Sequence, residues 1–265
     1  MRYRYSMTFQ ARTLVDPPLT LRFESVDALR GLAMVWMTVF HFCFDLNHFG
    51  YLTLDFYTDP FWTRQRSLIV SLFLFTAGLG QAIAVHQGQC WPRFWRRWAQ
   101  VAGGALLVSA GSYWMYPTTF IYFGVLHGVA VMLIIVRLTA GWGGWLWLCG
   151  LIAISSKFIA PYALGTGATA ELFNTMALNW LGWVSRNPVT EDYVPLIPWL
   201  GVMWWGIAAG QWLLCRQSFK LAEPFVKSGH ILPRLALLGR WSLSYYIFHQ
   251  PVLIGSLMAL AWLRL

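Results

Sequence analysis

The sequence is short of charged residues. Asp, Glu, Lys and Arg make up 11% of its 265 residues, whereas hydrophobic residues make up 58%. In a typical soluble domain about a quarter of the residues are charged, so an ordinary soluble domain is excluded. Acidic residues are scarcest, with 10 against 19 basic residues, but we do not interpret this excess as a nucleic-acid signal. We predict a multi-pass membrane protein, with the bilayer as its first partner.

Several common signatures are also missing. The four cysteines lie far apart, and their spacing fits neither a metal site nor a redox pair. Neither a phosphate-binding loop nor a cluster of metal ligands is found, so we expect no metal and no bound cofactor. The absence of an internal repeat disfavours common transporter architectures. Residues 1–24 lack the apolar core of a signal peptide and predict a cytoplasmic tail, followed by a single transmembrane domain over residues 25–265.

Long apolar runs predict an all-α bundle of about seven transmembrane spans. A spanning helix needs about 20 mostly apolar residues, and the candidate windows are 28–48, 67–86, 98–115, 120–139, 143–161, 195–215 and 235–262. Alternating spans place 14 of the 19 Lys and Arg residues on one side. Because positive residues concentrate in cytoplasmic loops, we predict a cytoplasmic N-terminus. In the last window we expect a bend at Pro251.

The first window carries ionisable residues at helical spacing. In the stretch SVDALRGLAMVWMTVFHFCFDL and the residues after it, a helix places Asp27, Arg30, His41, Asp45 and His48 in a stripe about 60° wide. Ionisable groups are costly in lipid, so the stripe must face protein or a wet cavity. His41 with Asp45 one turn away predicts a general-base pair. A purely structural hydrogen bond at His41 is the alternative.

Two later windows carry polar residues at a similar predicted depth. IYFGVLHGVAVML contains His127, and GRWSLSYYIFHQPVL contains Tyr245, His249 and Gln250. Counting along the helices puts both histidines near the level of His41. This predicts one polar cavity that opens outward, although an interhelical hydrogen bond at His127 and a proline-kinked helix around His249 are structural alternatives.

A basic mouth is expected at the cytoplasmic end of this cavity. It would be formed by Arg30, Arg240 and the arginines of residues 93–97. Arginine binds phosphate in a bidentate manner, so the mouth suits a phosphorylated donor. The pattern indicates group transfer from a donor inside to an acceptor outside. A proton-coupled small-solute transporter with an intramembrane His/Asp relay is the alternative function, and a non-catalytic assembly factor is a third.

Five sequence blocks resemble a known family. They are SVDALRGLAMVWMTVFHFCFDLNHFG, FWTRQRSLIVSLFLFTAGLG, FGVLHGVAVMLI, VPLIPWLGVMWWGIAAG and LGRWSLSYYIFHQPVLIG. Their order is similar to that in short bacterial members of the heparan-alpha-glucosaminide N-acetyltransferase catalytic-domain family, and they cover most of residues 23–256. The start of the first block is also similar to bacterial membrane acyltransferases that modify surface polysaccharides.

The resemblance implies a transmembrane acyltransferase that takes acetyl-CoA or another acyl-CoA from the cytoplasm and N- or O-acylates an extracytoplasmic sugar or glycan. Its implied residues are Arg30, Asp27 and Arg240 for acyl-CoA, His41 and Asp45 for catalysis, and His48, His127, Tyr245, His249 and Gln250 for the acceptor side. An acyl-histidine on His41 or on His48 is left open, as is a homodimer. The chain lacks the large non-cytoplasmic domain and extra spans of the lysosomal branch, so heparan is not its expected substrate.

Overall fold

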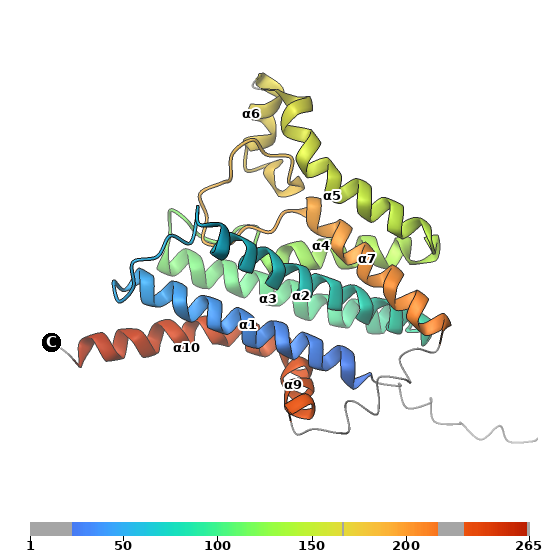
Figure 1. Ribbon diagram of the computed structural model, residues 1–265, viewed down its shortest axis with the longest axis horizontal. Coiled ribbons are helices and arrows are strands. Elements are labelled where there is room, and N and C mark those ends of the chain that lie inside the picture. Colours follow the sequence, from blue (N-terminus) through green and yellow to red (C-terminus); the bar gives the residue numbers. More distant parts are fainter. Residues whose placement is uncertain (1–22, 166, 217–230, 264–265) are drawn as a thin grey trace, which may run out of the picture.

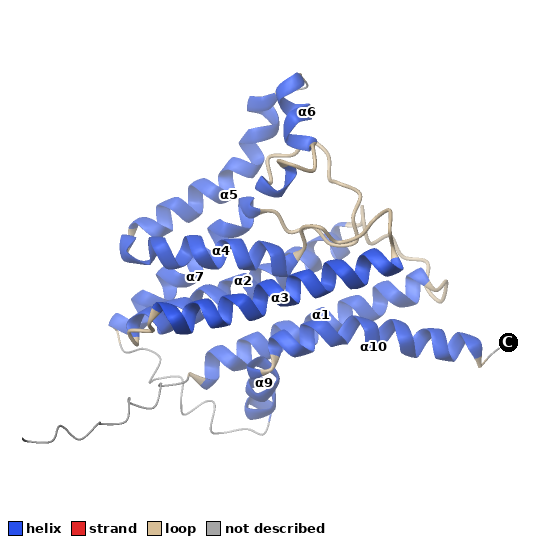
Figure 2. Cartoon of the chain, turned by 180° about the vertical axis from the view of Figure 1, so that it is seen from behind, coloured by secondary structure: helices blue, strands red, loops and turns tan. Residues whose placement is uncertain are grey.

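The fold is a bundle of helices (Figure 1). The structure is a computed structural model that describes residues 23–165, 167–216 and 231–263. Its elements are α1 (Glu24–His48), α2 (Pro60–His86), α3 (Trp91–Met115), α4 (Val125–Thr139), the short 3₁₀ helix η1 (Ala140–Trp142), α5 (Trp145–Leu164), α6 (Ala168–Asn174), η2 (Asn179–Leu181), α7 (Leu196–Cys215), α9 (Ile231–Arg240) and α10 (Ser242–Trp262). These described residues form no β-strand (Figure 2), which confirms the all-α prediction.

Four of the helices are long and apolar enough to cross a membrane. They are α1, α2, α10 and the segment Val125–Trp142 that joins α4 to η1. Helix α5 is a shorter apolar helix over Trp145–Ala160. In Figure 1, α1, α2, α3 and α10 run nearly parallel, whereas α5 is tilted and α9 lies across the bundle. We call the end with the start of α1, the start of α3 and α9 the basic end, and the other the opposite end.

The last predicted window is two helices, which corrects the expected position of the bend. Helix α9 ends at Arg240 and α10 begins at Ser242, while Pro251 lies inside a continuous α10. The break occurs here because α9 is fastened to the start of α1. A Cβ on Gly239 would overlap the backbone carbonyl of Asp27, so the two backbones are in direct contact. Helix α10 then turns to run beside α1.

Glycines also allow the closest helix pair. A Cβ on Gly78 of α2 would overlap the Met203 carbonyl of α7, and a Cβ on Gly206 of α7 would overlap the Phe75 carbonyl of α2. Small residues permit such close packing where lipid supplies no hydrophobic driving force between helices. The backbones of α2 and α7 are therefore in direct contact at the centre of the bundle.

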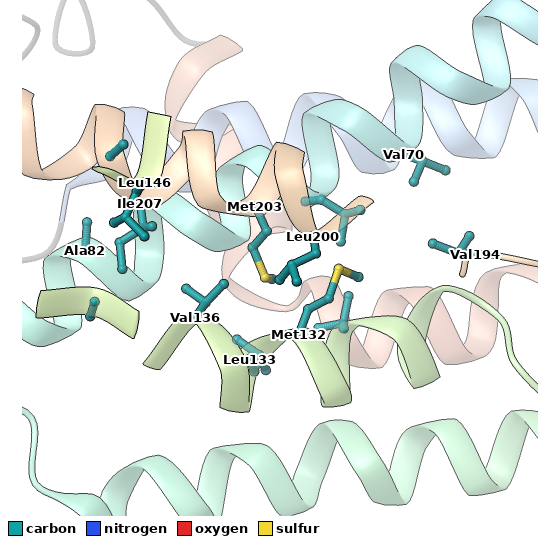
Figure 3. Packing of buried hydrophobic residues seen from close by; sticks show 14 of the residues in the cluster. Val70, Ala82, Met132, Leu133, Val136, Leu146, Val194, Leu200, Met203 and Ile207 are labelled. Carbon is teal, nitrogen blue, oxygen red and sulfur yellow. The ribbon is translucent and has the colours of Figure 1, made fainter. Parts of the chain in front are cut away.

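The hydrophobic core lies between α2, α4 and α7. Met132 and Val136 of α4 face Met203 and Ile207 of α7, and all four side chains are fully buried (Figure 3). Leu74 of α2 is buried in the same cluster. Since this core occupies one side of the bundle, the space between α1, α3 and α10 is left for a cavity.

Two loops are joined at the opposite end. The Glu191 amide donates to the Thr119 carbonyl over 2.9 Å, and the Val194 amide donates to the Phe123 carbonyl over 3.2 Å. The Asp192 carboxylate accepts from the Val125 amide over 2.8 Å, which satisfies one of the free amides at the start of α4. Burial raises the pKa of the Asp192 carboxyl. This joint holds two acidic side chains against the cavity.

Candidate active site

One cavity of about 370 Å³ lies among α1, α2, α3, α10 and the loop before α7. Small-molecule sites typically have volumes of about 300–1,000 Å³. Its polar lining includes His41, Asp45, His48, Arg66, Ser112, Tyr116, Glu191, Asp192, Tyr246, His249 and Gln250. The cavity therefore has the size and polar lining of a small-molecule site.

The polar side chains that α1 contributes to this cavity lie at His41 and beyond it toward the opposite end. Beyond His41 toward the opposite end, α1 contributes Asp45 and His48 to the lining, and toward the basic end it contributes Met37 and Ala33. Ala33 is eight residues from His41, a distance of about 12 Å along a helix. The imidazole of His41 thus lies where a polar outer part meets an apolar inner part.

His41 and His249 are neighbours across the interface of α1 and α10. Their ring centroids are 5.3 Å apart, with 62° between the ring planes. Among the described residues, no protein group forms a hydrogen bond with the His41 ring. The sequence predicted Asp45 as the partner of His41, but the structure pairs His41 with a second histidine instead.

The protonation of His249 is fixed by the backbone. Its Nδ1 lies 2.7 Å from the Tyr246 carbonyl oxygen. A carbonyl oxygen only accepts hydrogen bonds, so Nδ1 carries the proton and neutral His249 has its lone pair on Nε2. That Nε2 is buried and has no hydrogen-bond partner within the described part of the chain. A buried, unsatisfied acceptor in a cavity is the expected geometry of a general base awaiting a substrate proton.

Asp45 and Gln250 form a second polar pair. The Gln250 Nε2 donates to Asp45 Oδ1 over 2.8 Å, and Asp45 is only 3% exposed. Within the described ranges, Asp45 Oδ2 and Gln250 Oε1 have no partner. Buried polar atoms are normally hydrogen-bonded, so these two atoms indicate a site for a polar ligand. Asp45 and Gln250 line the same cavity as His249.

His127 does not line this cavity. Helix α4 begins at Val125 and not at 120, so His127 lies in its first turn. Its Nε2 is 3.0 Å from Ser109 Oγ, and its Nδ1 accepts from the Gly124 amide at 3.3 Å. Both ring nitrogens are therefore satisfied, and the acceptor-side role predicted for His127 is replaced by the structural alternative.

Tyr245 acts behind His249 and does not line the cavity. Its hydroxyl lies 2.6 Å from Thr38 Oγ1, which itself donates to the Met34 carbonyl. Tyr245 is therefore the donor to Thr38. Its ring is stacked on His249 with centroids 5.9 Å apart. Tyr245 supports the imidazole instead of contacting the cavity directly.

The predicted basic mouth is not part of this cavity either. Arg30 contacts Asp27 at 3.3 Å, and Arg240 contacts the same carboxylate at 3.7 Å. Arg240 also lies 3.5 Å from Glu24. The Arg240 pairs join α9 to α1, the Arg30 pair lies within α1, and all of these groups lie outside the cavity lining. The sequence analysis grouped Arg30 with His41 because both lie on one face of the first helix. That shared face does not show whether Arg30 lines an open cavity or contacts another part of the protein.

The polar residues of the cavity lining that the sequence analysis missed include Arg66, Ser112, Tyr116, Glu191, Asp192 and Tyr246. Arg66 of α2, Asp192 and Tyr246 line the cavity, and the Tyr246 hydroxyl forms a hydrogen bond with Asp192. Arg66 also acts electrostatically on Asp192. The adjacent acidic residues Glu191 and Asp192, in the long connection before α7 of a chain with few acidic residues, were a signal for two of them. Within the described ranges, no group of three or more His, Cys, Asp or Glu residues could hold a metal ion.

The comparison with known families gives a match over most of the chain. The sequence profile of the family described as "Heparan-alpha-glucosaminide N-acetyltransferase, catalytic" matches residues 22–251 of the 265. The chain belongs to this family. Membership implies a membrane acetyltransferase, and the matched region contains every residue of the cavity lining except Ile254. No curated protein and no solved structure matches the chain significantly.

Proposed function

We propose that this family member transfers an acyl group from acyl-CoA to a hydroxyl or amine of a sugar or glycan acceptor. The observation that carries the proposal is the unsatisfied Nε2 of His249 beside His41, in the cavity of a chain whose family is an acetyltransferase family. Acyl transfer to such an acceptor needs a base that removes the proton of the attacking hydroxyl or amine.

The proposed step uses His249 as the base. The acceptor binds in the polar outer part, where its O–H or N–H donates to His249 Nε2. Its oxygen or nitrogen then attacks the thioester carbonyl carbon, the carbon–sulfur bond breaks, and the departing thiolate takes the proton from the imidazolium. The Tyr246 carbonyl that accepts from Nδ1 stabilises the imidazolium between these transfers.

Asp45 and Gln250 are proposed to orient the acceptor. Asp45 Oδ2 accepts a hydroxyl or ammonium proton, and Gln250 can accept another through Oε1. Arg66, Glu191 and Asp192 extend this polar wall toward the opposite end. Such a mixed array of donors and acceptors suits a polyhydroxylated ligand better than an apolar one.

A covalent route through an acyl-histidine is a defined alternative within this function. His41 is better placed than His48 to carry the acyl group, since it contacts His249 and lies at the boundary with the apolar part. Incubation with acyl-CoA in the absence of acceptor, followed by peptide mass spectrometry, distinguishes the routes. An acylated peptide containing His41 supports the two-step route, and its absence during active turnover supports direct transfer.

The transmembrane direction is also proposed. The concentration of basic residues at one end supports a cytoplasmic donor, and the polar part of the cavity at the opposite end supports an extracytoplasmic acceptor. A bacterial inner membrane is the compartment in which both substrates are accessible. The donor's path from the basic end then requires α9 to separate from α1.

A proton-coupled transporter is less well supported. A relay across the bilayer needs polar groups along the whole path. Between His41 and Arg30, however, the side chains of α1 that line the cavity are Ala33, Met34 and Met37. These groups carry no proton, so the apolar lining favours acyl transfer over proton transport.

The test is acyl transfer by the purified protein in liposomes, with labelled acetyl-CoA and a mixture of cell-envelope glycans. Loss of a general base lowers rates by about 10²–10⁴-fold, so His249→Ala is expected to lose at least about 100-fold in kcat. His86→Ala is the matched control, because His86 is exposed at the end of α2. Full activity in folded His249→Ala, or no transfer by the wild type, would contradict the proposal.

A further inference from the structure

The cavity reaches the surface of the bundle between α3 and α10. Six apolar residues of these two helices line it there, and we call the opening between them the lateral slit: Leu107, Gly111 and Met115 on α3, and Ile247, Pro251 and Ile254 on α10. Within each set the residues recur every three or four positions, so they share one face of their helix. Leu107 and Met115 line the cavity and are nevertheless 64% and 42% exposed, so they lie on its rim.

The two helices touch at one level and are apart at the next. A Cβ on Gly104 of α3 would lie 3.2 Å from Ile247 Cδ1 and 3.5 Å from Leu243 Cδ1, both on α10. Gly111 is seven residues, or about two turns, further along α3 and therefore lies on the same face. A Cβ on Gly111 would have no atom of the described residues within 4 Å. The helices thus diverge toward the opposite end (Figure 2), and the lateral slit is open at that level.

The outer side of the lateral slit is hydrocarbon. Helix α10 is long and apolar enough to cross a membrane, and its Phe248 and Val252 side chains are exposed. Ser112 of α3 is polar, but its hydroxyl donates to the Ser109 carbonyl over 3.1 Å and accepts from the Ile121 amide over 3.0 Å. Since a polar group buried without a partner is costly, the slit accommodates a hydrocarbon chain better than a polar one.

The lateral slit is continuous with the polar wall of the site. Gln250 donates to the buried Asp45, and Pro251, the next residue of α10, belongs to the slit. From Leu107 to Met115 the slit follows α3 for eight residues, a distance of about 12 Å. A ligand with a polar head beside Gln250 would therefore place its following atoms between α3 and α10.

We propose that the acceptor is a sugar carried by a bilayer lipid, with the sugar in the polar part of the cavity and the hydrocarbon anchor in the lateral slit. This inference rests on the proposed function and names its acceptor class. The acceptor's oxygen or nitrogen bonds to the acetyl carbon, the carbon–sulfur bond of the thioester breaks, and the thiolate takes the acceptor's proton through His249. The donor still approaches from the basic end, so donor and anchor occupy different places.

A water-soluble glycan is the competing acceptor. It would enter at the opposite end, where His48 and Arg66 are exposed residues of the cavity lining. Such an acceptor makes no use of the lateral slit, because its hydroxyls would lack partners between α3 and α10. A substitution that fills the slit therefore distinguishes the two acceptors.

The experiment supplies labelled acetyl-CoA to the full-length protein in liposomes. The lipid extract and the water-soluble glycans of a bacterial cell envelope are offered in separate reactions. The label is expected in the lipid extract, where mass spectrometry should show a glycolipid that has gained one acetyl group.

Two variants fill the lateral slit from its two sides. Gly111→Phe places a ring in the open space on α3, and Ile254→Trp enlarges the side chain on α10. Each is expected to lower the initial rate of lipid labelling at least about tenfold, because the new side chain and the anchor overpack the same space. Gly103→Phe is the matched control: a Cβ on Gly103 also meets no described atom within 4 Å, and Gly103 lies on α3 outside the cavity lining. This control should keep the wild-type rate.

The outcomes separate this inference from the proposed function. Thermal unfolding shows which variants are folded, and Ile254→Trp provides the test if Gly111→Phe does not fold. Label that enters only the water-soluble glycans, or lipid labelling that persists in the folded slit variants, overturns the lipid-linked acceptor while acyl transfer stands. A bilayer lipid that merely fills the slit would give the first of these results. Transfer to neither fraction overturns the proposed function and the inference together.

Discussion

The ring of Tyr245 lies flat against the ring of His249, with 9° between their planes and 5.9 Å between their centroids. One side of the imidazole is thus held by an aromatic face, and its Nδ1 is held by the Tyr246 carbonyl. These two contacts leave Nε2 as the atom with freedom to react. The predictions below follow from this geometry and from the contacts around it.

Tyr245 is expected to position His249 through its ring. Tyr245→Phe keeps the stacked ring and loses the hydrogen bond to Thr38. The kcat should fall less than about threefold, because a weak neutral hydrogen bond contributes about 0.5 kcal/mol. Tyr245→Ala removes the face, and kcat should fall about tenfold with little change in KM, as for a lost aromatic pair. Steady-state kinetics of both variants provide the check. Equal losses in the two variants would contradict a role for the ring.

Gln250 is expected to stabilise the buried carboxylate of Asp45. Gln250→Met removes the 2.8 Å donor and leaves Asp45 Oδ1 without a partner. The free energy of unfolding should fall by about 1–3 kcal/mol, the cost of an unsatisfied buried acceptor. Denaturant unfolding in detergent measures this change. In the double variant with Asp45→Leu the loss should be smaller than the sum of the single losses, whereas additive losses would indicate that the pair is not coupled.

The contact of α9 with α1 is expected to depend on backbone packing more than on charge. Arg240 is exposed, and exposed ion pairs contribute about 0–1 kcal/mol, so Arg240→Ala should change stability by less than about 1 kcal/mol. Gly239→Val places a side chain against the Asp27 carbonyl and should cost about 1–3 kcal/mol, as overpacking does. Thermal unfolding of the two variants ranks the effects. The reverse ranking would show that the ion pairs hold α9.

Asp192 is expected to make stability depend on pH. Burial raises its folded-state pKa above the ordinary value of 3.8, so the folded protein binds this proton more tightly than the unfolded chain does. Its stabilising contribution is therefore present below pH 3.8 and is lost as pH rises through the raised pKa. Asp192→Asn stays neutral and keeps an acceptor for the Val125 amide, so its unfolding free energy should fall less over that range. Parallel pH profiles would contradict this assignment.

The sequence predicts the helices well because hydrophobic length and helical period are local properties. The stripe on α1 correctly placed His41, Asp45 and His48 on one cavity wall. The partner of Asp45 could not be predicted in the same way, because Gln250 lies 205 residues away and the choice between it and His41 depends on how α10 packs against α1.

Two other differences have the same tertiary origin. The position of His127 was misjudged because the chain before Val125 is apolar without being helical, so counting from Phe120 placed the imidazole too deep. The arginines at the basic end were taken for a mouth because the sequence does not show that Arg30 and Arg240 would both pair with Asp27. Asp192 lies in a loop that pairs with the residues before α4. This pairing could not be predicted, because loops lack the regular hydrophobic spacing that reveals helices in a sequence.

The proton on His249 Nδ1 is assigned by a peptide carbonyl. A carbonyl of the main chain persists whichever side chain occupies position 246, as long as α10 stays helical. Substitutions around the ring can therefore alter the rate and the substrate. They do not move the lone pair of the neutral imidazole from Nε2 to Nδ1. The backbone of α10 thus determines which nitrogen of His249 can accept a proton.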